Sequence, residues 1–550
     1  MAEAPLALLG PDGRPLPPAA RAPRPRAMVG DRTVPHGMEI WPYDAARWDG
    51  QEMGDWFPLI RSPDDEINLY RDTVVARARD LHRNDGWAKG GINRILDSAI
   101  GLQFRLAAKP DWKTLRRVDK AFDDVWAEEF ATEAQVAWAD YAEDVNRWAD
   151  GSRHHTMTQM FRLALAHKLI DGDALGVMLW LPENIGPGRA RYATALQIID
   201  PDRLSNPLEQ VDTAHFRNGV EINDLGAAQA YHIRRAHQYD MYNAMEAEIW
   251  DRVPRETDWG RPIVVHDFET DRAGQSRGIS VLASVMPRFK MLTRYDGAEV
   301  QAALLQTILS FFIESPYAQD DVRNALEGGD GDLRWYQEQR LAFHDQNPIT
   351  AGGVRIPKLF PGEKMAGVTA TRPHSNFDAF EHAVLRNIAA GLGISAEQLT
   401  QNWSKVNYSS ARAALLESWK TLIRRRTDFA LGFATPVYAS WLEEAVETRL
   451  RAAMPRRYAA IFAEHRTAFA RCRWLGPGRG WVDPLKERQG AVLGLDAGFS
   501  TLEKECAEQG EDWEDNLEQR ARELRRMRKL GIPLPDWTGD EPAQKTIRPQ

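Results

Sequence analysis

The chain has 550 residues, of which 43% are hydrophobic and 27% are charged, so it can bury a large core in about two to four domains. Its formal net charge of −9 argues against tight, nonspecific DNA binding, which requires Lys and Arg to neutralise phosphates. Cys472 and Cys506 are the only cysteines, too few for a disulfide scaffold or a four-cysteine zinc site.

The N-terminal segment, 1–54, differs in composition from the rest of the chain. Up to about residue 40 it is rich in Pro, Ala and Arg and has little apolar periodicity. This predicts a disordered arm, which either docks on another surface or remains a flexible tail. The apolar stretch APLALLG lacks a basic flank and is too short for a secretory signal, and no apolar run approaches the ~18 residues of a membrane helix. We therefore expect the chain to remain in the cytoplasm where it is made.

Residues 55–276 combine two kinds of pattern. Apolar residues recur at helical spacing over 67–100, which predicts helix. The segments 174–181, 193–199 and 263–268 are short, β-rich and bounded by Gly, Pro or Asp, which predicts strands. The sequence therefore indicates an α+β domain.

A long helical pattern follows over 277–313. Its apolar residues form two stripes, and Pro287 and Gly297 are predicted bends. The helical run itself starts at Ser280 and, at ~1.5 Å per residue, spans on the order of 45–50 Å. Residues 314–375 are rich in Gly, Pro and polar residues, with a strand-like segment at 353–361, and predict a small insert.

A second helical pattern covers 376–392. Its apolar face ends near Leu392, where Gly391 and Gly393 supply helix-stopping positions. We expect 393–407 to be a flexible loop, because it contains small residues and then a polar run. The residues of interest in this loop are Gly393, Ser395, Gln401, Asn402, Trp403, Ser404, Lys405 and Asn407.

A third helical region lies within 408–480. Ser409 and Ser410 stand where N-cap hydroxyls are wanted, and the Ala/Leu/Arg-rich run from 411 to about 445 predicts a long helix kinked near Pro436. A basic cluster on this helix is better explained by a solvated or intersubunit ion-paired face than by DNA contact. The cluster consists of Lys420, Arg424, Arg425 and Arg426.

The C-terminal part, 481–537, is predicted to be helical. Asp512, Glu514 and Asp515 precede a segment that ends in basic residues and then Gly531, so its charges complement a helix dipole. The last residues, 538–550, predict an unfolded tail.

Enzyme signatures are missing from the sequence. It has no G-x-x-x-x-G-K-[ST], G-x-S-x-G or H-E-x-x-H motif. GPGRG at 476–480 lacks a preceding predicted strand, which favours a surface loop over a phosphate cradle. His154, His155 and His167 have no acid or cysteine at ligand spacing around them, so we interpret them as polar helix positions and predict no metal site.

Paired acids are the remaining candidates for chemistry. Clustered carboxylates can bind a divalent cation or form a nuclease site, but Asp is also the ordinary residue of turns and caps, which we favour here. The pairs are Asp171 with Asp173, Asp200 with Asp202, and Asp330 with Asp332.

Several segments, in collinear order, resemble one known family. The most telling are IAAGLGIS at 388–395 and NYSSARAALLE, which begins with Asn407, Tyr408, Ser409, Ser410 and, after one Ala, Arg412. Together with five other segments they resemble portal proteins of tailed bacteriophages, the lambda-like family, over about 55–535. The other segments are 77–101, 171–180 (DGDALGVMLW), 196–207 (LQIIDPDRLSNP), 277–280 (RGIS) and 481–512.

The resemblance implies an α+β portal fold with named parts. Residues 55–276 would form the wing, long helices would form a stem around a channel, and 314–375 would form a small clip. The remaining parts would be stem helices at 277–313 and 376–392, a channel loop at 393–407, a kinked helix completing the wing at 408–480, and a helical crown at 481–537. Trp403 and Lys405 would come nearest to DNA; alternatively, Trp403 packs against a neighbouring subunit.

The resemblance also implies a structural rather than an enzymatic role. The chain would form a ring of twelve at one capsid vertex of the virion, through which double-stranded DNA is packaged and ejected, with no cofactor. Its partners would be the terminase large subunit, the major capsid and scaffold proteins, and head-completion or tail adaptor proteins. A capsid or scaffold assembly protein is an alternative, and a metal-dependent nuclease is a weaker one. A mildly acidic ring is consistent with DNA sliding through it.

Overall fold

A computed structural model describes residues 45, 53, 55–308, 311–314, 331–346, 364–367, 377–404, 408–455, 458–480 and 483–532. The chain divides into two compact units, Met1–Arg61 and Ser62–Gln550, and every element below belongs to the second. The predicted arm and tail lie almost wholly outside the described residues. None of the described helices is both long and apolar enough to cross a membrane.

Two helices, α1 (Pro63–Asn84) and α2 (Gly86–Ala99), replace the single helical region predicted at 67–100. Asp85 separates them, because its backbone is extended and its carboxylate accepts a hydrogen bond from Ala88 N at 2.9 Å. A residue in this conformation ends one helix and caps the next. The chain direction therefore changes at Asp85.

The helix expected over 277–313 begins only at Met286, and no sequence pattern predicted the helices at 124–142, 157–170 and 331–346. The remaining helices are separated by irregular segments. They are α3 (Trp112–Leu115), α4 (Asp124–Ala142), α5 (Met157–Ile170), α6 (Met286–Ile308), α8 (Gly331–Gln346), α9 (Phe377–Leu392), α10 (Ala396–Thr400), α11 (Tyr408–Phe429), α12 (Thr435–Thr448), α13 (Tyr458–Phe469), α14 (Pro484–Asp496), α15 (Leu502–Glu508) and α16 (Trp513–Leu530).

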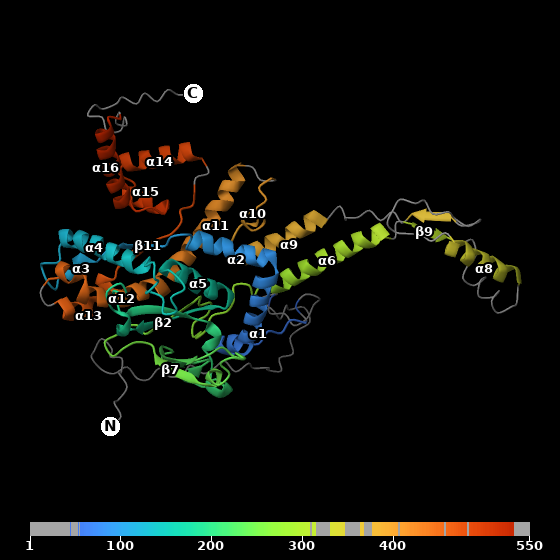
Figure 1. Ribbon diagram of the computed structural model, residues 1–550, viewed down its shortest axis with the longest axis horizontal. Helices are drawn as coiled ribbons and strands as arrows, with labels where there is room; N and C mark the ends of the chain where they lie inside the picture. The colour runs from blue at the N-terminus through green and yellow to red at the C-terminus, as the bar shows by residue number, and fades with distance from the viewer. Residues whose placement is uncertain are drawn as a thin grey trace, which may run out of the picture. The chain divides into compact units, whose positions relative to one another are not determined.

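The described strands form small antiparallel sheets. They are β1 (Arg105–Ala108), β2 (Asp173–Trp180), β3 (Thr194–Ile199), β4 (Phe216–Arg217), β5 (Val220–Ile222), β6 (Ala228–Arg234), β7 (Trp250–Pro254), β8 (Val264–Phe268), β9 (Phe311–Glu314), β10 (Lys364–Gly367) and β11 (Cys472–Leu475). The three strands predicted from the sequence, now β2, β3 and β8, form one sheet in the order β3-β2-β8. A mixed helix and sheet architecture is therefore confirmed (Figure 1).

Two hydrophobic cores hold the second unit together. The larger core surrounds α5 and α12 and contains an aromatic group in which Trp138 meets Tyr438 and Trp441 at centroid distances of 5.5 and 5.1 Å. The smaller core joins the β3-β2-β8 sheet to the β4-β5-β6-β7 sheet through residues such as Leu175 and Tyr231. Pairing of β1 with β11 connects residues more than 360 positions apart, with Arg105 opposite Leu475.

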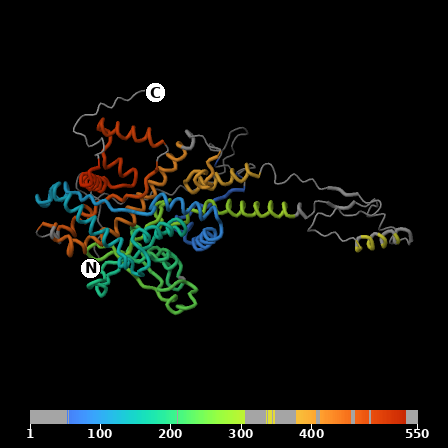
Figure 2. Tube along the Cα trace, turned by 45° about the horizontal axis from the view of Figure 1, so that its top comes forward, coloured from blue at the N-terminus to red at the C-terminus, as the bar shows by residue number. Residues whose placement is uncertain are grey.

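Helices α6 and α9 pack along each other (Figure 2). Tyr295 of α6 contacts the rings of Phe377 and Phe380 of α9, at centroid distances of 5.6 and 4.7 Å. Helix α9 ends at Leu392 as predicted. Pro287 is not a bend, because it lies in the first turn of α6, where its missing N–H has no helical partner to lose. The strand expected at 353–361 lies outside the described residues; β10 begins a few residues later and pairs with β9.

The long helix is interrupted close to the predicted position. Between α11 and α12 lies a π-helical segment, Ala430–Ala434, after which Thr435 N–H donates to Ala430 O. Pro436 has no N–H to offer the carbonyl four residues earlier, and the wider π-helical turn accommodates this loss. The expectation that Ser409 and Ser410 are N-caps is wrong, because the backbone is already helical at Tyr408.

The predicted C-terminal helices are present as α14, α15 and α16. Asp483, Thr501 and Asp512 cap their N-termini by accepting hydrogen bonds from backbone N–H groups. Helix α16 ends at Gly531, whose φ of 68° is the left-handed conformation expected of a C-terminal glycine.

Candidate functional site

The segment predicted to be a flexible loop, 393–407, is described as far as Ser404, and it is partly helical. Gly393 ends α9 with a φ of 71°, and Ser395 then caps α10. Ser395 and Gln398 form a reciprocal capping box, in which each side chain accepts from the other residue's backbone N–H. The expectation of a continuous loop is therefore wrong for α10, because this local pairing starts a helix.

Close packing fixes α10 to the body of the protein. Leu399 is buried, and a Cβ atom at Gly91 of α2 would lie 3.3 Å from its Cδ1 and 2.7 Å from Leu392 Cδ1. Gly393 is equally confined, since a Cβ there would lie 2.9 Å from Thr421 Cγ2 of α11. The glycine expected to give flexibility therefore permits close packing of α9 against α11.

The exposed part of the segment is short. Gln401 adopts a left-handed φ of 56°, and Asn402 Oδ1 then accepts hydrogen bonds from Ser404 N and Oγ, at 3.1 and 2.6 Å. Trp403 lies in this turn and is 38% exposed. Lys405 and Asn407 lie outside the described residues.

The family motif continues into the helix that follows this segment. Tyr408, Ser409 and Ser410 are the first residues of α11. Arg412 Nη2 lies 3.8 Å from Glu487 Oε1 of α14. The motif therefore leads from the exposed turn to a contact with the C-terminal helices.

The basic cluster on α11 is divided between solvent and interior. Lys420 pairs with Glu417 at 2.7 Å, and Arg424 pairs with Glu269 at 2.9 Å, both as exposed pairs. Arg425 instead donates to Leu392 O at 2.7 Å, at the end of α9. The prediction of a solvated or intersubunit ion-paired face fails most clearly for Arg426, because that residue is buried within this chain.

Arg426 ties three parts of the fold together. Its guanidinium donates to Ala99 O at 2.9 Å, and to Ser98 O and Pro477 O at 2.6 Å. Burial lowers its pKa to about 10, which leaves it charged at neutral pH. The segment 476–480, predicted to be a surface loop, is anchored by this bond to Pro477. The expectation that no strand precedes it is wrong, because β11 ends at Leu475.

Four of the paired acids converge around arginines. Arg79 of α1 contacts three carboxylates: Asp171 at 2.8 Å, Asp200 at 2.7 Å and Asp202 at 2.5 Å. Burial raises the pKa of Asp202, whereas hydrogen bonds from His167 and Arg79 outweigh burial and lower that of Asp171. The Arg79 guanidinium lies between these three carboxylates and joins them to α1.

Asp173 is the buried centre of the same network. Its Oδ2 accepts from Arg71 Nη2 and from Arg277 Nε, both at 2.8 Å, and its Oδ1 accepts from Gly278 N at 2.6 Å. Burial opposes ionisation, but the two guanidinium groups outweigh it and hold the pKa of Asp173 well below its usual range. Arg277 further donates to the carbonyls of Pro201 and Leu204, at 3.0 and 2.8 Å.

The expectation that no acid lies at ligand spacing around His167 is wrong. His167 does have an acid at helical ligand spacing, because Asp171 follows four residues later and its Oδ2 lies 2.6 Å from His167 Nδ1. His167, Asp171 and Asp200 offer ligand atoms within 4.8 Å of one another. Arg79 already binds both carboxylates, so this group is an ion-pair network. Asp330 lies outside the described residues.

His154 and His155 contact a different acid, Asp150. Their backbone N–H groups both donate to Asp150 Oδ2 at 2.9 Å, in a turn before α5. They are loop residues and do not form a helix face.

Sequence reasoning found the acids but missed their arginine partners. Arg71 and Arg79 are eight residues apart on α1 and therefore share a helix face, and Arg277 opens the RGIS motif. A helix whose core-facing side carries two arginines is a signal that buried acids lie opposite. The two arginines could therefore have indicated the buried acids before the fold was known.

Comparison with known proteins agrees with the segments noted in the sequence. The family model "Phage portal protein, lambda family" matches residues 49–426. The portal protein of Escherichia phage N15 is 34% identical over 493 residues, covering 89% of this chain and 90% of that protein. Portal protein B of Escherichia phage lambda is 34% identical over 496 residues, covering 89% and 90%.

Solved structures give a weaker likeness. A chain in the neck of a native GTA particle, computed with C12 symmetry, is 12% identical with a TM-score of 0.39, covering 73% of this chain and 94% of that one. The sequence comparisons alone are decisive, because the match spans well over half of the chain and the identity extends over nearly all of it. This chain belongs to the lambda family of phage portal proteins.

Proposed function

We propose that this chain assembles into a closed ring of twelve at one vertex of a phage capsid, and that double-stranded DNA passes through the ring during packaging and ejection. One observation carries the proposal: the 34% identity to the lambda portal protein, which extends over 89% of this chain. A ring whose subunits interact head to tail closes without exposed ends.

Each part of the fold would have its own role in the ring. Helices α6 and α9 would form the stem around the bore; α6 has 23 residues and is therefore about 35 Å long. The insert within 314–375 would form the clip that receives the terminase large subunit. The region built on the β3-β2-β8 and β4-β5-β6-β7 sheets would form the wing, and α14 to α16 would form the crown.

Residues 401–405 would approach the DNA within the bore. The support for this assignment is the anchoring of α10 through Leu399, which leaves the exposed turn at Trp403 to vary in shape. Lys405 would meet phosphate transiently, and Trp403 would supply an apolar surface that does not grip the duplex. A weak grip suits a conduit, because strong phosphate binding would slow passage.

A structural role, without catalysis or a cofactor, is supported by the state of the acids. The four carboxylates that converge near Arg79 are held by three arginines, and a nuclease needs carboxylates that can bind Mg²⁺. The partners would be the scaffold and major capsid proteins during assembly in the host cytoplasm, then the terminase, then head-completion or tail adaptor proteins in the virion.

Electron microscopy of the purified chain with two-dimensional class averaging tests the proposal. Uniform rings with a central hole wide enough for duplex DNA, on the order of 20 Å or more, are expected. Irregular shells would instead favour a capsid or scaffold protein. Cleavage of DNA that requires Mg²⁺ and is lost on replacing Asp171 and Asp173 would favour the nuclease alternative.

A further inference from the structure

The C-terminal helices have an unusual relation to the rest of the chain. Helices α14, α15 and α16 together contain no buried residue. Large apolar side chains stand in solvent: Leu485 and Leu493 of α14 are 69% and 66% exposed, and Phe499 is 88% exposed. Because Leu485 and Leu493 are eight residues apart, they lie on one face of α14. Such a face normally requires a partner.

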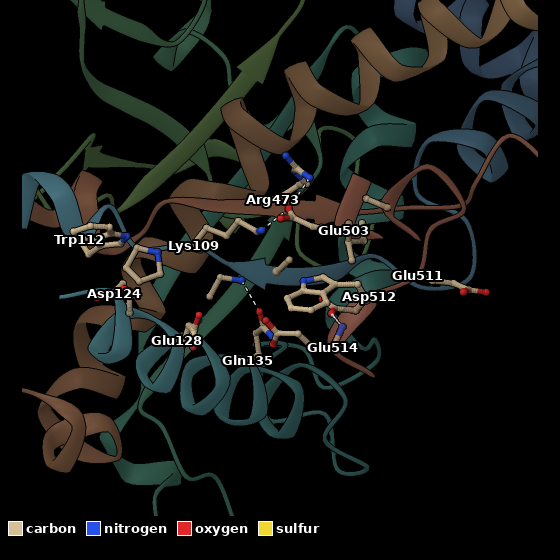
Figure 3. Close-up of a pocket in the computed structure, with 18 residues that line it drawn as sticks. Lys109, Trp112, Asp124, Glu128, Gln135, Arg473, Glu503, Glu511, Asp512 and Glu514 are labelled. Carbon is tan, nitrogen blue, oxygen red and sulfur yellow. Dashed lines mark hydrogen bonds and ion pairs between the residues drawn. The ribbon is translucent and has the colours of Figure 1, made fainter. Parts of the chain in front are cut away.

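Charged contacts help to attach these helices to the body. Glu503 of α15 pairs with Lys109 and, at 3.0 Å, with Arg473, and Asp515 pairs with Arg105 at 3.4 Å. The contacts surround a pocket of about 330 Å³ between β1, β11, α4 and the start of α16 (Figure 3). Figure 3 shows Lys109 and Arg473 directed at Glu503 and away from the acids on the opposite wall.

The opposite wall of the pocket is acidic. Asp124 and Glu128 lie one turn apart on α4, and Glu514 faces the same pocket from the first turn of α16. Among the described residues, none of these three carboxylates has an ion-pair partner. Burial and the neighbouring Asp512 raise the pKa of Glu514 and outweigh the attraction of the Lys109 charge.

The other end of α16 carries the complementary charge. Arg525, Arg526 and Lys529 occupy one face of the helix, are exposed, and have no ion-pair partner in the described part of the chain. These residues lie 11 to 15 positions beyond Glu514, which is about 16–22 Å along the helix axis. A regular helix cannot fold back over that distance, so its basic end cannot reach the pocket that its own first turn lines.

We propose that the basic face of α16 (Arg525, Arg526 and Lys529) of one subunit docks on the acidic pocket wall (Asp124, Glu128 and Glu514) of the next copy of this chain. The contact joins two different surfaces, and repetition of such a contact closes a ring when the rotation between neighbours is a whole fraction of a turn. This inference rests on the proposed ring assembly. It adds the residues that select the neighbouring subunit, since complementary charges fix the register of an interface.

Charge reversal in the full-length chain tests the pairing. One variant carries Arg525→Glu, Arg526→Glu and Lys529→Glu; a second carries Asp124→Lys, Glu128→Lys and Glu514→Lys; a third carries all six changes. Native mass spectrometry and sedimentation velocity measure the concentration at which half of the chains are in rings. Each triple variant should raise that concentration by at least about tenfold. The variant with all six changes should return it most of the way to the wild-type value.

A cysteine pair provides a test that does not depend on altered charge. With Glu128→Cys and Arg526→Cys in one chain, mild oxidation should give a ladder of disulfide-linked multimers on a denaturing gel. The single variants, which keep native Cys472 and Cys506, should give no such ladder.

The outcomes separate this inference from the ring proposal. Rings that form equally well in both triple variants, or a double-cysteine chain without a ladder, would overturn the α16 pairing while leaving the portal ring intact. Loss of DNA binding with unchanged rings in the first variant would assign the basic face to nucleic acid, which also overturns the pairing. A wild-type chain that forms no rings would refute the proposed function itself.

Discussion

Gly432 lies directly against Asp267: a Cβ atom at Gly432 would come within 2.3 Å of Asp267 Oδ1. Asp267 is held in place because Lys168 Nζ lies 2.6 Å from its Oδ2, with both side chains about 10% exposed. The π-helical segment Ala430–Ala434 therefore packs against the end of β8 through a position where only glycine fits.

Replacing Gly432 by Ala should consequently destabilise the protein. The added methyl must displace a carboxylate fixed by the largely buried Lys168, and overpacking of this kind lowers the free energy of unfolding by about 1–3 kcal/mol. Urea unfolding followed by tryptophan fluorescence measures the change. Gly297→Ala is the matched control, because nothing lies within 4 Å of a Cβ there and helix propensity favours Ala by up to about 1 kcal/mol. Equal effects of the two changes would contradict the packing argument.

Asp173→Asn should be more damaging than its modest change in shape suggests. The substitution leaves the guanidinium groups of Arg71 and Arg277 buried without their shared carboxylate, which should lower the free energy of unfolding by about 3–5 kcal/mol. Thermal unfolding measured by calorimetry would show the loss. Asp97→Asn removes an exposed carboxylate that pairs with Arg162 at 2.7 Å, and it should cost at most about 1 kcal/mol.

Stability should fall in acid, and Asp173 should account for part of the fall. Its folded-state pKa is depressed, so its contribution is fully present above the unfolded-state pKa of about 3.9 and is lost as pH falls toward the folded value. The melting temperature should therefore decrease below about pH 4. In Asp173→Asn this decrease should be shallower, because unfolding of the variant takes up about one proton fewer than unfolding of the wild-type protein. Parallel curves for the two proteins would exclude Asp173 as a source of the acid sensitivity.

Cys472 should resist alkylation in the folded protein. Burial raises the pKa of its thiol from an ordinary value of 9.0 to about 11, so the reactive thiolate should be about 100-fold rarer at a given pH. Iodoacetamide labelling at pH 8 with peptide mass spectrometry measures the rate. Unfolding the chain in urea should remove the protection. Rapid labelling of native Cys472 would show that the thiol is accessible and ionised.

Trp403→Ala should separate DNA passage from folding. The side chain is 38% exposed in a turn that α10 positions, so its removal should change the free energy of unfolding by less than about 1 kcal/mol. Phage carrying the variant should nevertheless package less DNA, measured as nuclease-protected genome per head. Trp403→Phe, which keeps an aromatic surface, should retain packaging. Normal packaging by the Ala variant would remove Trp403 from the proposed channel surface.

Local signals in the sequence determined much of the secondary structure. The end of α9 at Leu392, the three strands of the β3-β2-β8 sheet and the cap at Gly531 follow from glycine placement and from apolar and β-rich patterns within a few residues of each site. The family was equally accessible, because collinear motifs depend on residue order alone.

The tertiary structure decided which charges meet and which are buried. Asp173 and Arg277 are 104 residues apart, and Arg426 and Ala99 are 327 apart, so no local pattern distinguishes these partners from other acids, bases and carbonyls. Composition indicated flexibility at Gly393, yet the approach of α11 makes that position a packing site. A local pattern sets where a helix or strand begins and ends, whereas packing of distant elements fixes each polar group's surroundings and therefore its burial, its pKa and its role.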